Sequence, residues 1–393
     1  MKADFIIRGG RVMDPYTGAD EIKDIVVRNT RIADPEGEYV ECGHIIHADG
    51  CIVAPGLIDF HTHIFHEGSG SAIRPDFMIS QGTARFQSHL CIKTAGTAGT
   101  VTYESFYKSV IAQSTVRIKG FLTTYSGGQL DFKLCEDFNP ELINLARMER
   151  VIDKYRDNIL GLKIRLSKGV VPDDKALDYL KRVIELADEL DERLGTSLRV
   201  CVHTTNSPIP ASELADCLRP GDIFCHCFQG AGNTIIMENG QIWPGILEAR
   251  KRGVIFDAAN GRGNFGAATA KQALKAGFLP DIISTDLTID KFNIPPYTKN
   301  LPSVMAKYMT MGMNLMDVLN TVTAAPAKIM GMEGKIGTLQ PGADADIVIL
   351  KEKQLSFIQK DFKDEELVSN ALLVPQLTMC AGEINFCQAD FFL

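Results

Sequence analysis

Residues 55–63 read Pro-Gly-Leu-Ile-Asp-Phe-His-Thr-His, a mostly apolar stretch that ends in two histidines one residue apart. An extended strand points the side chains of residues i and i+2 to the same face. His61 and His63 therefore direct both imidazoles to one point, as two ligands of one metal ion must. Histidine is the commonest metal ligand, so the pair predicts a metal site where a buried strand ends. The alternative is two histidines that lie close together without a metal.

This strand is the first of eight apolar segments that alternate with helical segments between residues 55 and 290. Helices are predicted most clearly over Pro140–Tyr155 and Asp173–Leu194, where apolar residues recur at i, i+3 and i+4. Eight strand–helix units favour an α/β fold of the (β/α)8 TIM barrel type over an open doubly wound sheet. The predicted strands are Leu57–His63, Gly99–Tyr103, Arg117–Thr124, Ile159–Leu166, Leu198–His203, Ile223–Cys227, Val254–Asp257 and Asp281–Asp286.

Both flanks of this region carry short alternating strands separated by turns. Neither flank has enough apolar residues for a core of its own. We therefore expect a small β-sandwich domain built from residues 1–54 together with residues 336–393, beside a barrel domain that spans residues 55–335. The flanking strands are expected at Asp4–Arg8, Asp24–Val27, Gly43–Ala48, Ala345–Leu350 and Leu367–Val374.

The bulk composition excludes several classes of protein. The chain of 393 residues is 45% hydrophobic and carries a net charge of −8, which argues against a nucleic-acid partner. No apolar stretch approaches the ~20 residues that cross a bilayer, so no membrane partner is expected. The segment Met1–Arg8 is charged too early for a signal peptide, which favours a cytoplasmic enzyme with a small-molecule substrate.

Ten cysteines in a chain of this size do not indicate a disulfide framework. The tripeptide Cys225-His226-Cys227 resembles a chelate, but alternation along a strand would turn both cysteines away from His226. We expect both thiols to be small core side chains.

Four of the eight histidines end predicted strands one, five and six. A barrel places its active site at the C-terminal ends of its strands, so these four should meet at one mouth. Asp286 ends the eighth strand, beside the first. The expected metal ligands are therefore His61, His63, His203, His226 and Asp286.

Lys163 lies among apolar residues in the fourth predicted strand, where a charged amine is costly. Nearby metal cations would lower its pKa and favour a neutral amine, which can add carbon dioxide to form a carbamate that bridges two metals. The alternative is an ammonium group paired with a carboxylate of the barrel.

The histidine pair, the single histidines that end strands five and six, the aspartate of strand eight and the segment Lys335–Asp346 resemble the amidohydrolase superfamily. Lys163 resembles the carboxylated lysine of its binuclear branch, which includes dihydroorotases and dihydropyrimidinases. The segments Gly161–Arg165, His226–Phe228 and Leu279–Leu287 resemble a dihydroorotase-like group whose members include deacetylases of small acids.

The resemblance implies two divalent metal ions, of which zinc suits imidazole and carboxylate ligands best. His61, His63 and Asp286 would hold the buried metal, His203 and His226 the exposed one, and Lys163, as N6-carboxylysine, would bridge both. A bridging hydroxide would attack the scissile carbonyl, and Asp286 would act as the catalytic acid–base. The superfamily often forms homo-oligomers.

Substrate contacts should come from loops that follow the strands. Arg165 lies two residues after Lys163 and can bind a substrate carboxylate, or it can close the barrel rim as a salt bridge. Further candidates are Tyr125 after strand three, Thr204 and Asn206 after His203, and Arg262 after strand seven.

The resemblance implies hydrolysis of the amide or ester bond of a small acylated, carboxylate-bearing substrate, with an acetyl group as the expected acyl group. A cyclic-amide hydrolase of the dihydroorotase or dihydropyrimidinase type is the first alternative, because the same hydroxide opens a ring. A mononuclear deaminase would lack Lys163 and carry a glutamate soon after His203, where Thr204, Thr205 and Asn206 stand. A scaffold that has lost catalysis would have lost ligands.

Overall fold

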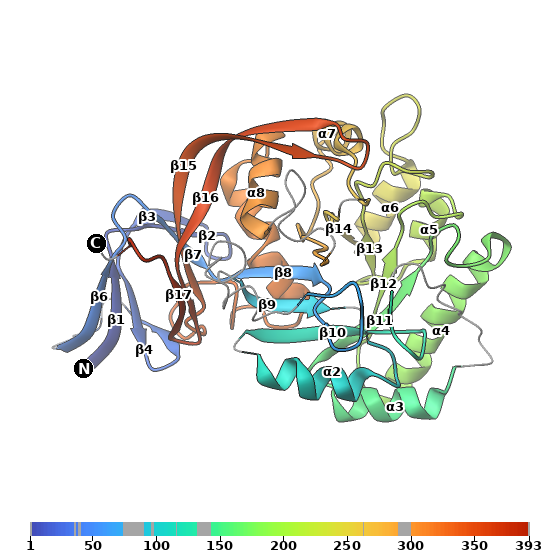
Figure 1. Cartoon of the computed structure of the whole chain (residues 1–393), viewed down its shortest axis with the longest axis horizontal. Coiled ribbons are helices and arrows are strands. Elements are labelled where there is room, and N and C mark those ends of the chain that lie inside the picture. Colours follow the sequence, from blue (N-terminus) through green and yellow to red (C-terminus); the bar gives the residue numbers. More distant parts are fainter. Residues whose placement is uncertain are drawn as a thin grey trace.

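The structure is a computed structural model that describes residues 2–34, 37, 41–73, 90–95 in their backbone, 98–114, 116–131, 143–261, 263–289 and 300–391. Its centre is a sheet of seven parallel strands in the order β14-β13-β12-β11-β10-β9-β8 (Figure 1). The strands are β8 (Leu57–Thr62), β9 (Leu90–Ala95), β10 (Arg117–Thr123), β11 (Ile159–Arg165), β12 (Arg199–His203), β13 (Ile223–Cys225) and β14 (Ile255–Asp257).

The segment 281–287 closes this sheet into a barrel. It forms one parallel bridge from Ile282 to Asp257 of β14 and another from Leu287 to Thr62 of β8. The amide of Asp286 donates to the carbonyl of His61 at 2.7 Å. The eighth predicted strand therefore occupies the expected position, although it is held by isolated bridges rather than by a regular ladder.

Helices pack around the barrel and bury its outer face. The longest, α4, places Leu180, Val183 and Leu190 on one apolar face and ends at Gly195, whose φ of 62° favours glycine. The helices are α2 (Tyr103–Ser109), α3 (Leu145–Lys154), α4 (Ala176–Leu194), α5 (Ala211–Cys217), α6 (Pro244–Arg252), α7 (Ala267–Lys275), α8 (Leu301–Thr310), α9 (Leu315–Thr321) and α10 (Ala324–Ile329), with short 3-10 helices η1 (Ile111–Gln113) and η3 (Asp173–Lys175).

The prediction of a strand over Gly99–Tyr103 is wrong. The second strand is β9, and residues 99–102 form a turn before α2 begins at Tyr103. The hydroxyl of Thr102 accepts from the amide of Gly99 at 3.0 Å and donates to the carbonyl of Gly127 at 3.1 Å. These two bonds, one within the turn and one to a distant residue, outweigh the strand preference of the β-branched residues.

The flanking segments form two further sheets. One has the order β5-β4-β1-β6, and the other has the order β17-β16-β15-β7-β2-β3 and so combines strands from both ends of the chain. Buried residues of both sheets share one hydrophobic cluster. The strands are β1 (Lys2–Arg8), β2 (Arg11–Asp14), β3 (Ala19–Ile22), β4 (Ile25–Arg28), β5 (Arg31–Ala33), β6 (Glu41–His47), β7 (Ile52–Pro55), β15 (Ile347–Lys360), β16 (Glu366–Cys380) and β17 (Glu383–Cys387).

Strands β15 and β16 are much longer than predicted and form a hairpin that leaves this sheet. Figure 1 shows the hairpin crossing over α8 and ending beside α7, on the barrel. It covers α8, whose residues Leu301–Tyr308 are all buried. The C-terminal segment thus reaches from the sheet that contains β2, β3 and β7 to the barrel.

Two expectations about the chain as a whole can be compared with the structure. The eight cysteines whose side chains the structure describes are all free thiols, and Cys225 and Cys227 are buried as expected. Within the same residues, every helix is too short or too polar to cross a lipid bilayer.

Candidate metal centre

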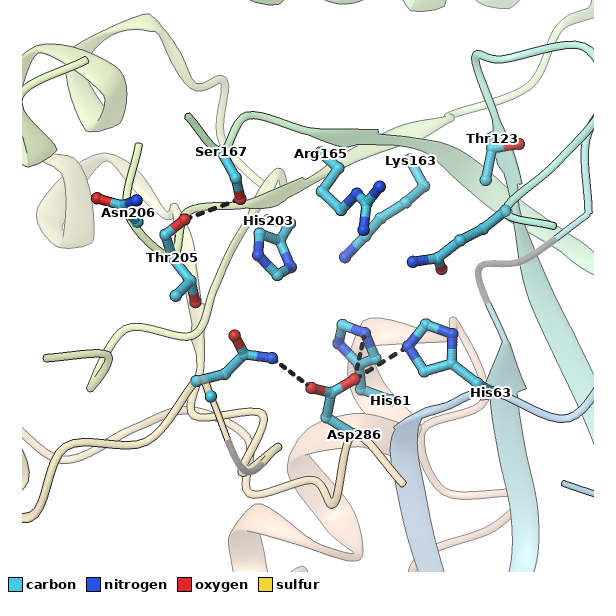
Figure 2. Close-up of a pocket in the computed structure, with 13 residues that line it drawn as sticks. His61, His63, Thr123, Lys163, Arg165, Ser167, His203, Thr205, Asn206 and Asp286 are labelled. Atoms are coloured by element: carbon cyan, nitrogen blue, oxygen red, sulfur yellow. Dashed lines mark hydrogen bonds and ion pairs between the residues drawn. The ribbon is translucent and has the colours of Figure 1, made fainter. Parts of the chain in front are cut away.

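A cavity of about 280 Å³ opens where the barrel strands end. Five of the six predicted ligands line it: His61, His63, Lys163, His203 and Asp286 (Figure 2). The sixth, His226, lies directly behind them, with its ring centre 4.3 Å from that of His203 and 5.3 Å from that of His61. The structure therefore brings together all six residues, which span positions 61–286 of the sequence.

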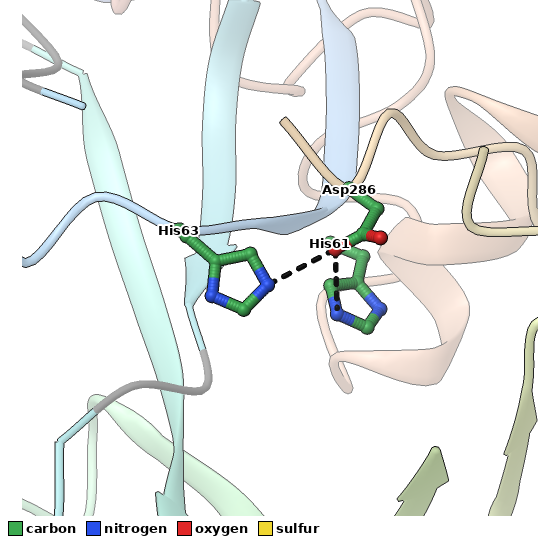
Figure 3. Close-up of side chains that lie close together, drawn as sticks. All are labelled: His61, His63 and Asp286. Atoms are coloured by element: carbon green, nitrogen blue, oxygen red, sulfur yellow. Dashed lines mark hydrogen bonds and ion pairs between the residues drawn. The ribbon is translucent and has the colours of Figure 1, made fainter. Parts of the chain in front are cut away.

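His61, His63 and Asp286 form the tightest group (Figure 3). The Oδ1 atom of Asp286 lies 3.0 Å from Nε2 of His63 and 3.6 Å from Nε2 of His61. One nitrogen or oxygen from each residue falls within 4.8 Å of the others, which is a spacing that one cation can span. All three side chains are buried, so the group can bind a cation away from bulk water.

The second nitrogen of His61 faces a buried carboxylate. Nδ1 lies 3.4 Å from Oδ2 of Asp257, while Oδ1 of Asp257 accepts from the hydroxyl of Ser284 at 2.6 Å and the amide of Ala259 at 3.0 Å. A carboxylate on one ring nitrogen favours the tautomer that leaves the other nitrogen free to bind a metal. This arrangement directs the lone pair of Nε2 of His61 toward Asp286 and the cavity.

His226 reaches the site through an unusual backbone angle. Strand β13 ends at Cys225, and His226 has a φ of 61°, so the strand alternation assumed for residues 225–227 is wrong. Its Nδ1 lies 2.9 Å from the carbonyl of Ala259, which can only accept, so Nδ1 donates. Nε2 of His226 is buried and has no hydrogen-bond partner among the residues that the structure describes. A buried imidazole nitrogen with a free lone pair fits a metal ligand.

Lys163 and His203 enter the cavity from neighbouring strands. Arg165 pairs with His203 in the β11–β12 ladder, and Lys163 lies two residues earlier on the same face. The amine of Lys163 lies 3.4 Å from Sγ of Cys201 and 3.7 Å from Sγ of Cys225. Cys225, Asp257 and His61 also lie within 4.8 Å of one another, so this thiol lies at the floor of the site.

Burial lowers the pKa of His63 and, more strongly, that of His203, and it lowers the pKa of His226 to about 3. Burial raises the pKa of Asp286, but the hydrogen bond from His63 and the neighbouring histidine charges outweigh it and hold that pKa well below its usual range. Neutral imidazoles and an ionised carboxylate are the forms that bind metals.

The pKa values of Lys163 and His61 shift in the opposite direction, upward. Burial lowers the pKa of Lys163, but the charges of Cys201, Cys225 and Asp286 outweigh it, so that the pKa is raised. Burial and Lys163 lower the pKa of His61, while Asp257 and Asp286 outweigh them and raise it. Both shifts favour an extra positive charge beside Asp286 and Asp257, which bound cations would replace.

Two of the predicted substrate contacts line the cavity, and two do not. Arg165 and Asn206 form part of its wall. Thr204 is buried, and its hydroxyl donates to the carbonyl of Cys225 at 2.6 Å, so it supports β13 instead. Tyr125 does not line the cavity, and Arg262 lies outside the described residues.

The sequence analysis missed Asn264 and Asp257. The amide of Asn264 donates to Oδ2 of Asp286 at 2.6 Å, and Asn264 also lines the cavity. A methyl group on Gly261 would lie 2.0 Å from the same oxygen, so only glycine fits there. Asn264 and Asp257 both lie at or shortly after the end of a predicted strand, which was the available signal, but the directions of their side chains cannot be inferred from spacing.

The sequence and fold of this chain are similar to those of known proteins. The family described as "Amidohydrolase family" matches residues 52–384. A deacetylase from Agrobacterium fabrum is 30% identical over 311 residues, which cover 77% of this chain and 71% of the relative. Among solved structures, an adenine deaminase matches with a TM-score of 0.84 and 24% identity over 98% of this chain and 100% of its own. A dihydroorotase matches with a TM-score of 0.81 and 23% identity over 97% and 98%.

Proposed function

Because this chain belongs to the amidohydrolase family, a family of hydrolases, we propose that it hydrolyses the amide or ester bond of a small acylated, carboxylate-bearing substrate in a metal-dependent reaction. The observation that carries this proposal is that three histidines, one lysine and one aspartate line one cavity at the barrel mouth, with His226 next to His61 and His203. An acetyl group is the proposed acyl group, because relatives from Agrobacterium fabrum and Enterococcus faecalis are named deacetylases.

We propose that the donor set holds two divalent cations, with zinc as the proposed metal. His61, His63 and Asp286 would hold one cation, and His203 and His226 the other. Lys163, carboxylated by carbon dioxide, would bridge both. The free Nε2 of His226 and the carboxylate behind His61 support this assignment. When bound, two such cations lower the pKa of a shared water and polarise the scissile carbonyl.

Asp286 is the proposed catalytic residue. Its low pKa keeps the carboxylate ionised at neutral pH, so it can accept the proton of the attacking water and return it to the leaving group. Asn264 holds Oδ2 of this carboxylate, while Oδ1 faces His61 and His63. The two oxygens therefore have different partners, which fixes the plane of the carboxylate.

Arg165 and Asn206 are proposed to bind the substrate, because both line the cavity. A guanidinium group can bind the substrate carboxylate with two parallel hydrogen bonds. The cavity volume of about 280 Å³ lies just below the range of about 300–1,000 Å³ that is usual for small-molecule sites, which favours a small substrate. Thr204, Tyr125 and Arg262 stay predictions. Thr204 and Tyr125 do not line the cavity, so its geometry does not support them as substrate contacts.

We further propose that residues 1–54 and 336–393 form one β-sandwich domain beside a barrel domain of residues 55–335. The shared hydrophobic cluster and the sheet that combines β2, β3 and β7 with β15, β16 and β17 support this division. The hairpin β15–β16 extends beyond it, onto the barrel.

The second candidate function is hydrolysis of a cyclic amide, because dihydroorotases are among the relatives and the metal ligands serve both reactions. A release assay separates the two. The zinc-loaded enzyme, supplied with bicarbonate, is offered N-acetyl amino acids, O-acetyl hydroxy acids, dihydroorotate and hydantoins. We expect turnover of the acetylated acids. Turnover of the cyclic amides alone would favour the second candidate, and turnover of none would refute the proposal.

A further inference from the structure

The tip of the hairpin β15–β16, residues 361–365, lies against two loops that border the active site. The ring of Phe362 lies against Gly230 and Gly266, which follow strands β13 and β14 respectively. A methyl group on Gly230 would lie 2.4 Å from Cε1 of Phe362, so only glycine at this position leaves room for the ring. The amide of Phe362 also donates to the carbonyl of Phe265 at 3.1 Å.

Asp361 also holds the hairpin tip against the start of α7. One carboxylate oxygen accepts from the amides of Lys363 and Glu365, which shapes the tip. The other accepts from the amide of Ala267 at 2.9 Å, at the start of α7. The residue before α7 is Gly266, which has no side chain for this role, so Asp361 supplies the missing cap from a distant part of the sequence.

The loop held in this way carries Asn264. Asn264 immediately precedes Phe265, the residue whose carbonyl binds the tip, and its amide donates to Oδ2 of Asp286 at 2.6 Å. Helix α8 supports the loop from within, where Tyr308 donates to Asn260 and the amine of Lys307 lies 4.2 Å from the centre of the Phe265 ring. The tip holds the part of the loop next to Asn264.

We propose that Phe362 and Asp361 are positioning residues, which hold the loop between β14 and α7 so that Asn264 keeps the carboxylate of Asp286 in its catalytic orientation. The inference rests on the proposed role of Asp286 and extends it to a hairpin that starts outside the barrel. It predicts that a change at the tip reaches the metal centre without a contact between them.

The test compares Phe362→Ala with Asn264→Ala, the double variant and Phe362→Leu, whose side chain refills the slot. The control is Ile358→Ala, because Ile358 is 46% exposed on β15 and lies outside the tip. Two quantities are measured on each full-length protein: the zinc dissociation constant, by competition with a chromogenic chelator, and kcat and KM for whichever substrate the wild type hydrolyses.

Loss of a group that orients a metal ligand costs about 10–100-fold in metal affinity or activity, so we expect losses near the lower end of that range for Phe362→Ala and Asn264→Ala. The loss should fall on kcat rather than KM. The double variant should lose no more zinc affinity or kcat than Asn264→Ala alone, because both changes act through the same hydrogen bond from Asn264 to Asp286. Phe362→Leu and Ile358→Ala should stay close to the wild type.

Wild-type zinc affinity and kcat in folded Phe362→Ala would overturn the proposal, and so would losses that multiply in the double variant. If Phe362→Ala does not fold, Gly230→Ala makes the same test by pushing the ring outward. A wild type that hydrolyses no substrate would refute the proposed function instead, while the zinc measurement would still test the hairpin.

Discussion

At the scale of single residues, the site depends on backbone angles that are uncommon outside glycine. Asp286, His226, Ala259 and Asn206 all have positive φ values, of 50°, 61°, 32° and 52°. Such angles cost of order 1–3 kcal/mol each and persist only where the surroundings impose them. Here they occur at two proposed ligands, Asp286 and His226, and at Ala259, whose carbonyl accepts from His226. The strain is thus concentrated where the chemistry is proposed.

Asp286→Asn should separate metal binding from turnover. An amide oxygen can still face a cation, but the amide cannot accept a proton at neutral pH. General acid–base catalysis contributes about 10²–10⁴-fold, so we expect kcat to fall by at least about 100-fold, while elemental analysis of the zinc-saturated protein finds nearly the wild-type zinc content. A variant that turns over at the wild-type rate would show that another group moves the proton.

Gly261→Ala should displace Asp286 without changing any polar group. The added methyl would lie 2.0 Å from Oδ2 of Asp286, a distance that atoms do not tolerate. A shift of about 1 Å at a catalytic group costs about 100-fold in rate, so we expect a loss of that size in kcat. The matched control is Gly70→Ala, where the nearest atom lies 3.5 Å away and wild-type kcat is expected. Equal activity of both variants would contradict the position assigned to Asp286.

At the scale of elements, one buried carboxylate attaches the segment 281–287 to β8. Oδ1 of Asp59 accepts from the amide of Thr285 at 3.0 Å, and Oδ2 accepts from its hydroxyl at 2.6 Å. The segment has only two isolated bridges to its neighbours, so these bonds replace part of a regular ladder. They also fix the residue directly before Asp286.

Thr285→Val should destabilise the protein, because it keeps the shape of the side chain and removes the donor to a charged, fully buried group. Hydrogen bonds to charged groups contribute about 1.5–3 kcal/mol, and we expect a loss in this range in urea unfolding. Thr234→Val removes a half-buried hydroxyl that donates to the carbonyl of Ile236 at 3.1 Å, and it should cost less than about 1.5 kcal/mol. Equal losses would argue against a special role for Asp59.

Sequence patterns predicted most of the barrel elements, and the two errors, at Gly99–Tyr103 and at the end of β13, have physical causes. Strands β8 and β10 to β14 lie at their predicted positions because their apolar runs are bounded by polar turns. The Gly99–Tyr103 segment has the β-branched residues of a strand, yet Thr102 bonds to its own turn and to Gly127. Such long-range competition leaves no trace in periodicity. The same holds for His226, whose backbone angle no alternation rule predicts.

At the scale of the whole molecule, the hairpin β15–β16 and the barrel bury α8 between them. Within α8, Lys307 is 2% exposed, beside the Phe265 ring and near Asp361. The sequence indicated that both termini would form one region, but not that this hairpin would extend to the barrel. Its length became apparent only from the pairing of Lys360 with Glu366 at the far end of the ladder.

Lys307 should make stability depend on pH. Burial lowers its pKa to about 7 from the ordinary 10.5, whereas the unfolded chain keeps its proton up to that higher value. The unfolded state therefore binds more protons between these values, and stability should rise with pH across this window. At about 1.4 kcal/mol per pKa unit, Lys307→Met should add on the order of 5 kcal/mol below pH 7 and nothing above pH 10.5. Urea unfolding of both proteins across this range measures the difference, and a constant difference would contradict the assignment.

Six side chains of this barrel are proposed to hold two metals that hydrolysis requires. The most direct test of this proposal is a titration of the chelator-stripped enzyme with zinc in bicarbonate buffer, with hydrolysis measured at each step on the substrate found in the release assay. We expect activity to be absent without zinc, to rise until two equivalents are bound per chain, and to level off there. Full activity without zinc, or a plateau at one equivalent, would contradict the binuclear site.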